Sequence, residues 1–572
     1  MIQRIEGARP HQQHRSVSRR HFLGRGLAVT AGTAAAVVTP GLLPYARTAV
    51  PVSQPDWPAA LSLPAAVDDV NTAVAPVGRA LQMPFTLGVA SGDPTSDGVV
   101  LWTRLAPEPL DADGRGGMPA RDVEVEWQLA GDAGFRSVLR TGTETARRSS
   151  AHSVHVELSG LPADGEFFYR FRADGHLSPV GRTRTAPAPG SLAPLTFAVT
   201  SCSNFEHGWF TAYRHLADSG PDLVFNLGDY LYEAAPGAFP VLSGSVRYHV
   251  GERTTTLHGY RQRHAQYKAD PDLQAAHAAA PWVVAYDDHE VLNNWAANTA
   301  AHTEDQRHFP AIRTAAMQAY YEHMPLRRVA RPHAGHMQMY RRLSWGQLAN
   351  FHVLDTRQYR DNQPCGDGID KRCPERHDPR RTMLGRRQEA WLAGGLAASE
   401  AKWDVLAQQI FFSPLWLRGF PWGADNPGKT GFNMDAWDGY PDARERLLKS
   451  VAAARLRNFA ILTGDWHSHW AANVLNPYAD LDSTPLGIEL VTSSISSDGD
   501  GERHPAWGLR SMALQPYLRH FDQRRGWIEV NLTAQRLRAD FRVVDYVSRK
   551  GAPARSSGVF VAQDGLPGLL PA

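Results

Sequence analysis

Three separated segments of the chain run from an apolar stretch into a cluster of side chains that bind metal ions. They are residues 223–233 (LVFNLGDYLYE), 283–295 (VVAYDDHEVLNNW) and 460–470 (AILTGDWHSHW). An apolar run that ends in Gly-Asp or Asp-Asp-His is typical of a buried strand whose carboxyl end delivers ligands to a crevice. The ends of three such strands can lie close together and place their ligands at one site, so the pattern indicates a metalloenzyme.

The first two segments offer hard and strongly donating ligands. Asp229 can bridge two cations because a carboxylate has two oxygens, and Tyr232 could bind ferric iron as a phenolate. In the second segment, Asp287, Asp288 and His289 supply oxygens and an imidazole, although the same residues would also suit the first turn of a helix. Each pattern is weak alone, so the prediction depends on their combination.

The third segment has the most specific spacing. Asp465 and His467 are two residues apart, so in an extended chain both side chains point to one side. His469 continues that alternation, and one of the two histidines could support the ligands instead of binding metal.

The cysteines add a further ligand. Cys365 and Cys373 enclose a short polar loop that an oxidising compartment would readily close as a disulfide. Cys202 is left over and follows the apolar segment 195–199, a candidate strand end. Thiolate and tyrosinate both donate strongly to Fe(III), which favours ferric iron over zinc or magnesium. The predicted metal ligands are Cys202, Asp229, Tyr232, Asp288, Asp465 and His467, a mixed set that suits two or three ions.

The N-terminus predicts export. Arg19 and Arg20 precede a weakly apolar stretch at 27–43, as in signals for the twin-arginine (Tat) route, which exports folded proteins. No later run approaches the roughly 18 apolar residues of a membrane span. We therefore expect a soluble, secreted protein, in the extracellular space, cell wall or periplasm, that meets the Tat machinery.

Length and charge limit the function class. A chain of 572 residues exceeds what one core usually organises, and its net charge of +2 argues against a stable nucleic-acid partner. We expect a monomer with these parts: a signal peptide (1–49), an N-terminal arm (50–83), a β-sandwich (84–188), a catalytic domain (189–550) and a C-terminal tail (551–572).

The two central parts have different patterns. Short alternating strands in 84–188 predict an antiparallel sandwich of fibronectin or immunoglobulin type. After residue 195 strands and helices alternate, which predicts an α/β layered fold with ligands at the carboxyl ends of the strands. The alternating segments 526–534 and 536–547 predict a hairpin at a sheet edge.

A series of motifs resembles one known family. They are GVASGDPTSDGVVLWTR (88–104), SCSN (201–204), GDYLYE (228–233), DDHEVLNNW (287–295), LDTRQYR (354–360) and GDWHSHW (464–470). The chain resembles the bacterial alkaline phosphatase D (PhoD-like) family of metallophosphoesterases, which is similar in plan to purple acid phosphatases. The resemblance implies a four-layer metallophosphoesterase β-sandwich flanked by helices.

The resemblance also implies Fe(III) and Ca²⁺. Cys202, Tyr232 and His467 would hold iron, and Asp229 would bridge iron and calcium. Asp288 and Asp465 stand where purple acid phosphatases have an Asn and a His, and carboxylates favour calcium. The neighbours of this set, Asn293 and Asn294, could complete a calcium shell or cap their segment.

The implied reaction is attack of a metal-activated water on phosphorus, in an alkaline phosphatase or phosphodiesterase. His289 is the candidate to contact phosphate or assist the leaving group. Arg357 could contact phosphate or form a structural ion pair. The basic segment 371–387 could lie near a polyanionic substrate, but a solvated approach to a helix is the preferred interpretation.

Two alternatives stay open. A calcium-dependent phospholipase D would need the same metals and differ in the leaving group. A non-catalytic metal-binding or phosphate-binding protein would require the loss of ligands, whereas every matched motif is intact.

Overall fold

The computed structural model describes residues 81–241, 244–421 and 428–572. The expected signal peptide and nearly all of the expected arm lie outside these ranges. Within them, no helix is long and apolar enough to cross a membrane.

The first strands form two layers that pack face to face. Residues of β1, β2 and β5 share one core with residues of β3 and β6, as the alternating burial along β6 requires. The strands within each layer pair antiparallel, which confirms the predicted two-layered antiparallel arrangement. Its assignment to the immunoglobulin type stays a prediction. The strands are β1 (Val89–Thr95), β2 (Gly98–Arg104), β3 (Val123–Ala130), β4 (Val138–Ala146), β5 (Ser153–Leu158), β6 (Glu166–Ala173), β7 (His176–Leu177) and β8 (Gly181–Arg184).

The layer that contains β1 extends into a ten-stranded sheet with the order β25-β24-β23-β22-β9-β10-β11-β1-β2-β5. Its centre is the parallel set β9 (Leu195–Thr200), β10 (Leu223–Leu227) and β11 (Pro281–Ala285). Nearly every residue of these strands is buried, which explains their continuous apolar sequence. The remaining strands are β22 (Gly526–Leu532), β23 (Arg536–Val544), β24 (Ala554–Gln563) and β25 (Leu566–Pro571).

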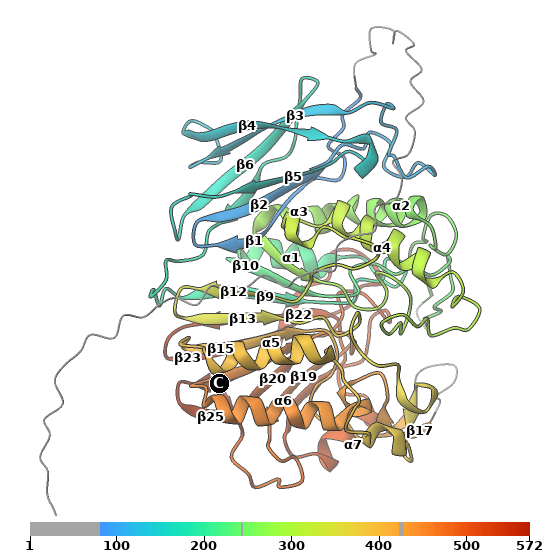
Figure 1. Cartoon of the computed structure of the whole chain (residues 1–572), viewed down its shortest axis with the longest axis vertical. Helices are drawn as coiled ribbons and strands as arrows, with labels where there is room; N and C mark the ends of the chain where they lie inside the picture. Colours follow the sequence, from blue (N-terminus) through green and yellow to red (C-terminus); the bar gives the residue numbers. More distant parts are fainter. Residues whose placement is uncertain (1–80, 242–243, 422–427) are drawn as a thin grey trace, which may run out of the picture. The chain divides into compact units, whose positions relative to one another are not determined.

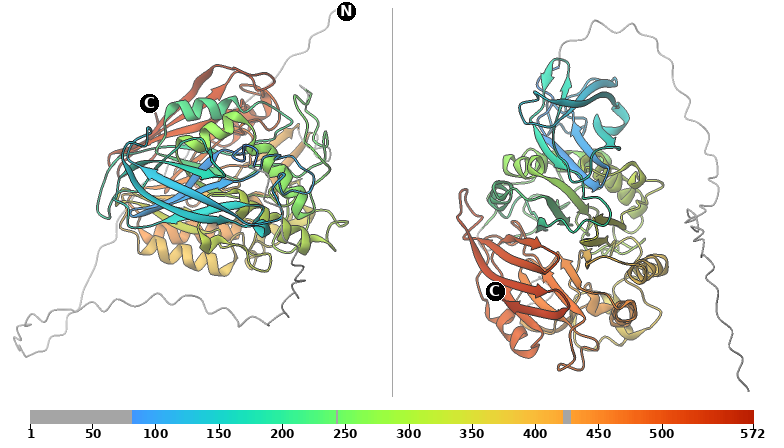
Figure 2. Two further views of the ribbon diagram at one scale, coloured as in Figure 1. Left: turned by 90° about the horizontal axis from the view of Figure 1, so that it is seen from above. Right: turned by 90° about the vertical axis from the view of Figure 1, so that its left-hand side faces the viewer.

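A seven-stranded sheet faces the first one. Phe197 and Phe225 of the first sheet meet Phe351 of the second, with ring centroids 5.6 and 4.8 Å apart, in a core shared by both sheets. Figure 2 shows the C-terminal strands (red) alongside strands of the second sheet (orange). In spatial order the second sheet contains β12 (Arg341–Trp345), β13 (Ala349–Val353), β15 (Trp403–Gln408), β18 (Phe459–Thr463), β20 (Gly487–Val491), β19 (His469–Val474) and β21 (Leu518–Asp522).

Helices cover the outer faces of both sheets (Figure 1). The first group packs on the ten-stranded sheet: α1 (Thr211–Ser219), α2 (Leu257–Lys268), α3 (Pro271–Ala279) and α4 (Phe309–His323). The second packs on the seven-stranded sheet: α5 (Gly385–Ala397) and α6 (Pro441–Ala454). The boundary between α2 and α3 is set at Asp270, whose carboxylate accepts hydrogen bonds from backbone amides in the first turn of α3. Helix, sheet, sheet and helix confirm the layered α/β expectation.

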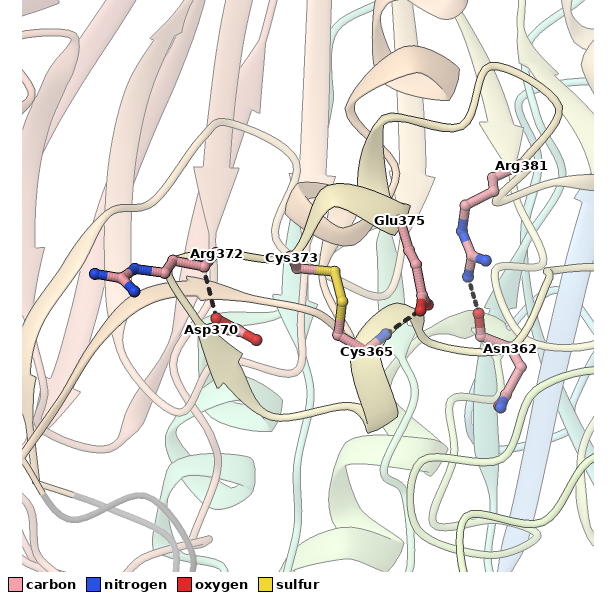
Figure 3. Close-up of a disulfide and its surroundings, with 7 residues drawn as sticks. All are labelled: Asn362, Cys365, Asp370, Arg372, Cys373, Glu375 and Arg381. Atoms are coloured by element: carbon pink, nitrogen blue, oxygen red, sulfur yellow. Dashed lines mark hydrogen bonds between the residues drawn. A yellow bond between two sulfur atoms is a disulfide. The ribbon is translucent and has the colours of Figure 1, made fainter.

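A smaller sheet and one helix lie beside the strand ends that carry ligands. The sheet has the order β14 (Ile369–Asp370), β17 (Lys429–Asn433) and β16 (Leu417–Phe420), and the helix is α7 (Ala506–Leu514). The predicted disulfide between Cys365 and Cys373 is present and closes the loop that contains β14 (Figure 3).

Two expectations for the C-terminus are wrong. Residues 551–572 are not a tail, because β24 and β25 add two antiparallel strands to the large sheet. The hairpin of β22 and β23 is consequently not at the edge, since β22 pairs with β9 and β23 pairs with β24. Asp564 and Gly565, the turn between the last strands, are a typical hairpin signal that distinguishes such a strand pair from a tail.

Candidate metal centre

The expected ligands follow the carboxyl ends of four buried strands. Cys202 follows β9, Asp229 follows β10, Asp288 follows β11 and Asp465 follows β18. Because β9, β10 and β11 are parallel neighbours, their ends meet at one edge of the sheet. Glu290 ties two of these ends together, since its carboxylate accepts hydrogen bonds from the amides of Tyr230 and Asp287.

The backbone at the ligands is unusual. Cys202, Asp229, Asp465 and His467 all have left-handed φ values, of 60°, 51°, 63° and 47°. Residues other than glycine adopt this region at a cost, and such strain concentrates at functional sites. Gly228 also has a positive φ, of 99°, and a Cβ there would in addition lie 2.4 Å from the Cβ of Asp287.

These turns correct the expected geometry of the third segment. Asp465 and His467 do reach the same site, but through two left-handed residues and not through the alternation of an extended chain. As a result Trp466, which an extended chain would direct away from them, lines the same pocket. His469 lies elsewhere: its Nδ1 accepts from the amide of Ser493, and its Nε2 lies 3.1 Å from the Arg542 carbonyl oxygen.

Ligand atoms converge in three overlapping groups, each within a span of 4.8 Å. The groups are Cys202, Asp229 and His467; Asp229, Asp288 and His289; and Asp229, Asp287, Asp288 and Asp465. Asp229 belongs to all three, as a bridging carboxylate would. We call Cys202, Tyr232 and His467 the thiolate half of the centre, and Asp287, Asp288 and Asp465 the carboxylate half.

The thiolate half is held by hydrogen bonds. The Tyr232 hydroxyl donates to Asp229 Oδ2 (3.0 Å), lies 3.1 Å from His467 Nε2 and accepts from Ser497 Oγ (2.7 Å). On the other side of the imidazole, Asp498 Oδ2 lies 2.7 Å from His467 Nδ1. The contact at Nδ1 orients Nε2 toward the centre, as supporting carboxylates do for histidine ligands.

The carboxylate half is held by one arginine. Arg357 Nε donates to Asp287 Oδ1, and its Nη2 lies 3.4 Å from Asp288 Oδ1. Asp288 Oδ2 accepts a hydrogen bond from the backbone N–H of Asn294 (2.7 Å). Asp287 Oδ2 is buried without a hydrogen-bond partner in the described part of the chain. A buried carboxylate oxygen without a partner suits a cation.

The protein alone disfavours the anionic forms of these groups. Burial, together with neighbouring carboxylates, raises the pKa of Cys202, Tyr232, Asp229 and Asp465 well above their ordinary values. A bound cation would remove this penalty, because it stabilises thiolate, phenolate and carboxylate. The donor set therefore fits metal ions.

His289 lies at the edge of the carboxylate groups. Its Nδ1 is 2.7 Å from Glu233 Oε2, and its ring lies with its centroid 4.1 Å from that of Tyr232, the two planes tilted by 31°. Burial opposes protonation, but Glu233, Asp229 and Asp288 outweigh it and raise the pKa of His289 well above its usual value. The imidazole is thus positioned as a hydrogen-bond donor.

Arg357 requires a correction. Its side chain is completely buried, and besides Asp287 and Asp288 it donates to Asp435 Oδ1 (2.9 Å). Its Nε, Nη1 and Nη2 atoms each donate to a carboxylate. Arg357 therefore forms the structural ion pair and not a phosphate contact. The backbone N–H of Asn293 donates to Glu233 Oε1 (3.0 Å), while a calcium-binding role for its side chain stays a prediction.

A pocket of about 170 Å³ opens beside the centre. Its polar lining is Asn294, Asn433, Asp435, Asp465 and His467, and its aromatic lining is Phe420, Trp466 and Trp507. Sequence reasoning missed Asp435, Asn433 and Asp498 because each follows an irregular segment or a short strand with no ligand-like spacing.

The disulfide braces one wall of this pocket. Asp367, inside the closed loop, accepts from Asn294 Nδ2 (2.7 Å), and Ile369 pairs with Asn433. Figure 3 shows Glu375 accepting from the amide of Cys365, which fixes the loop from the other side. In the basic segment, by contrast, Arg380 pairs with Asp378, as a solvated surface would.

Two facing sheets with helices on their outer faces form a fold that is also found in a purple acid phosphatase. A purple acid phosphatase, PPD1 from yellow lupin (Lupinus luteus) seeds, shares this fold with a TM-score of 0.50 and 12% identity, over 83% of this chain and 74% of that one.

The family is narrower than the fold. Residues 197–541 match the PhoD-like phosphatase family and residues 71–187 its N-terminal domain, so the chain belongs to the PhoD-like phosphatases. It is 46% identical to alkaline phosphatase D of Bacillus subtilis (strain 168) over 85% of this chain and 82% of that protein. A solved structure of PhoD matches with a TM-score of 0.82 at 46% identity, over 87% of this chain and 93% of that one. The chain is therefore a phosphoric ester hydrolase.

Proposed function

We propose that this enzyme is a metal-dependent alkaline phosphatase and phosphodiesterase that hydrolyses phosphate esters with Fe(III) and Ca²⁺. The observation that carries the proposal is the convergence of three ligand groups on one shared carboxylate, Asp229. Bound cations would neutralise the phosphoryl oxygens and lower the pKa of a water molecule that attacks phosphorus.

Iron would occupy the thiolate half. Cys202, Tyr232 and His467 offer a thiolate, a phenolate and an imidazole, and the two anions are strong donors to a ferric ion. Burial raises the pKa of both anionic ligands, so a highly charged cation has the largest effect on their ionisation.

Calcium would occupy the carboxylate half. Asp288 and Asp465, together with Asp229, offer oxygens only, which is the ligand type that calcium prefers. Asp287 adds a fourth carboxylate whose free oxygen faces no other partner in the described residues.

His289 would act on the substrate directly. Glu233 holds Nδ1, so Nε2 is the nitrogen that can donate to a phosphoryl oxygen or to the leaving group. Arg357 would act only by positioning Asp287 and Asp288.

Export by the Tat route is part of the proposal. Folded export lets the cytoplasm load iron against competing metals before calcium joins outside. Rerouting the protein through a signal for unfolded export should lower its iron content; unchanged iron would contradict this. The monomeric state stays a prediction.

The test combines metal analysis with turnover. Purified enzyme should contain iron and require calcium. Cys202→Ala should lose both iron and phosphatase activity, and a single cooperative thermal unfolding transition should show that this variant is still folded. A panel of a monoester, a simple diester and phosphatidylcholine then separates the substrate classes. Turnover without iron would overturn the proposal, and far faster cleavage of the lipid would favour a phospholipase.

A further inference from the structure

The pocket beside the metal centre has two unlike sides. One side carries the polar groups already described, and the other is a continuous aromatic wall made of Phe420, Trp466 and Trp507. These three residues come from the end of β16, from the ligand segment after β18 and from the first turn of α7. Three separate elements thus place rings at the mouth of one site.

The rings of the wall contact one another. Phe420 lies against Trp466 at 5.9 Å with nearly parallel planes, and it meets the edge of Trp507 at 5.0 Å. A second aromatic layer supports them, because Phe411 lies 5.6 Å from Trp466 and Phe521 lies 5.1 Å from Trp507. A wall packed in this way is preorganised and loses little entropy when a ligand stacks on it.

Trp466 fixes the position of the aromatic wall relative to the candidate metal ligands. It is bonded in the chain to Asp465 and His467, and its own amide donates to the Gly464 carbonyl oxygen (2.7 Å). Its indole Nε1 is buried and has no hydrogen-bond partner among the described residues. A donor shielded in this way does not reach a ligand in the pocket, so Trp466 contributes its ring to the wall.

The polar side does not offer a spare negative charge to a ligand. Asp435 accepts hydrogen bonds from Arg357 Nη1 (2.9 Å) and Gln363 Nε2 (2.6 Å), and Asp465 belongs to the proposed cation site. The wall therefore favours a neutral, flat group over a cation. A cavity of about 150 Å³ accepts benzene, so a pocket of about 170 Å³ has room for one ring.

We propose that Phe420, Trp466 and Trp507 bind the leaving group and select phosphate esters whose alcohol carries a planar apolar ring close to the ester oxygen. This inference rests on the proposed phosphoesterase function and adds the chemical class of the leaving group. Ring stacking contributes only when the ester is seated at the metal centre, so selectivity should be visible in kcat/KM.

The experiment compares esters of alcohols with similar acidity on the metal-loaded, full-length enzyme. The probes are 2-phenylethyl, 2-cyclohexylethyl and 2-hydroxyethyl phosphate, each also as the methyl diester. We expect kcat/KM for the phenylethyl ester to exceed that for the hydroxyethyl ester by about tenfold, with the cyclohexyl ester between them. Phe420→Ala should reduce this ratio at least about threefold.

A matched control is Trp391→Ala. Trp391 is a half-buried tryptophan of α5 that packs on Tyr340 and lies outside the pocket lining. This variant should keep the wild-type ratio. Trp466→Phe, which retains a ring but removes the indole N–H, should lower kcat/KM for the phenylethyl ester less than Phe420→Ala lowers it.

Each contrary outcome overturns the inference in a recognisable way. If the ratio of kcat/KM between the phenylethyl and hydroxyethyl esters is near one, or if Phe420→Ala does not change it, the aromatic wall does not bind the leaving group. Preference for the 2-(trimethylammonio)ethyl ester over its neutral 3,3-dimethylbutyl isostere shows a cation cage instead. No turnover of any ester would overturn the proposed function, and this inference with it.

Discussion

The thiolate half and the carboxylate half of the centre share Asp229 but are supported by opposite means. In the thiolate half the supporting partners are neutral or acidic: Ser497 for Tyr232 and Asp498 for His467. In the carboxylate half a permanent cation, Arg357, already offsets part of the negative charge.

This difference would explain how the two proposed kinds of metal ion fit side by side. Among the described residues, no cation hydrogen-bonds to the donor side chains of the thiolate half: the buried Arg525, whose charge acts on Cys202 and Tyr232, donates to Ser494 and Ser497 instead. These donors therefore need a highly charged ion to ionise. The carboxylate half needs less charge and offers only oxygens. Charge balance, as well as donor type, therefore favours a ferric ion on one side and a divalent ion on the other.

The largest effect should come from the residue that both halves share. Asp229→Asn removes a bridging charge, so we expect phosphatase activity to fall by more than about 100-fold, the upper end for a merely supporting residue. Metal analysis should show loss of iron and calcium together. Loss of one metal alone would contradict the bridging role.

Chelation should separate the halves without a mutation. Treatment with a calcium-selective chelator should abolish activity, because it removes only the ion held by oxygens, and added calcium alone should restore it. Activity and iron content are measured at each step. A requirement for added iron would show that the two ions are not held independently.

Arg357→Gln should weaken the carboxylate half specifically. Breaking a buried ion pair typically costs about 3–5 kcal/mol of stability, and misplacing Asp287 and Asp288 should reduce activity about 10–100-fold. We expect the calcium concentration for half-maximal activity to rise while iron content is unchanged. Arg380→Gln, a change at an exposed arginine paired with Asp378, is the control.

Asp498→Asn should have the corresponding but smaller effect on the thiolate half. The carboxylate at Nδ1 orients His467 and strengthens its other nitrogen as a ligand, so we expect about tenfold weaker iron retention. Iron release to a chelator over time measures this. An unchanged release rate with a raised calcium requirement would reverse our assignment.

The smallest effect should come from the disulfide. Replacing Cys365 and Cys373 by serine frees the loop that holds Asp367 against Asn294, so we expect activity to fall severalfold with iron content unchanged. Activity and iron content of the two proteins are compared without added reductant, because a reductant would also act on a ferric ion; equal activities would contradict the bracing role of the disulfide.

The convergence of the candidate ligands could be predicted from the sequence, because each follows a local signal. Asp229, Asp288 and Asp465 end buried apolar strands, and such strands can be recognised from hydrophobicity alone. The layered fold followed from the same alternation of strands and helices.

What could not be predicted depends on contacts between distant segments. The choice between phosphate contact and ion pair for Arg357 depends on Asp435, which is 78 residues away in the chain. Left-handed turns at Asp465 and His467, which no spacing rule contains, bring Trp466 into the pocket. The C-terminal strands have a local turn signal at Asp564 and Gly565, but their place in the large sheet depends on pairing with β23, which is a contact with a separate segment.

The most direct test is the metal content of two variants that each remove one ligand from one half. Cys202→Ser should lose iron, and Asp288→Asn should keep iron but lose calcium, both measured per folded chain after dialysis against limiting metal. Loss of calcium from Cys202→Ser and of iron from Asp288→Asn, or equal loss of both metals from both variants, would contradict the division of the centre into two halves.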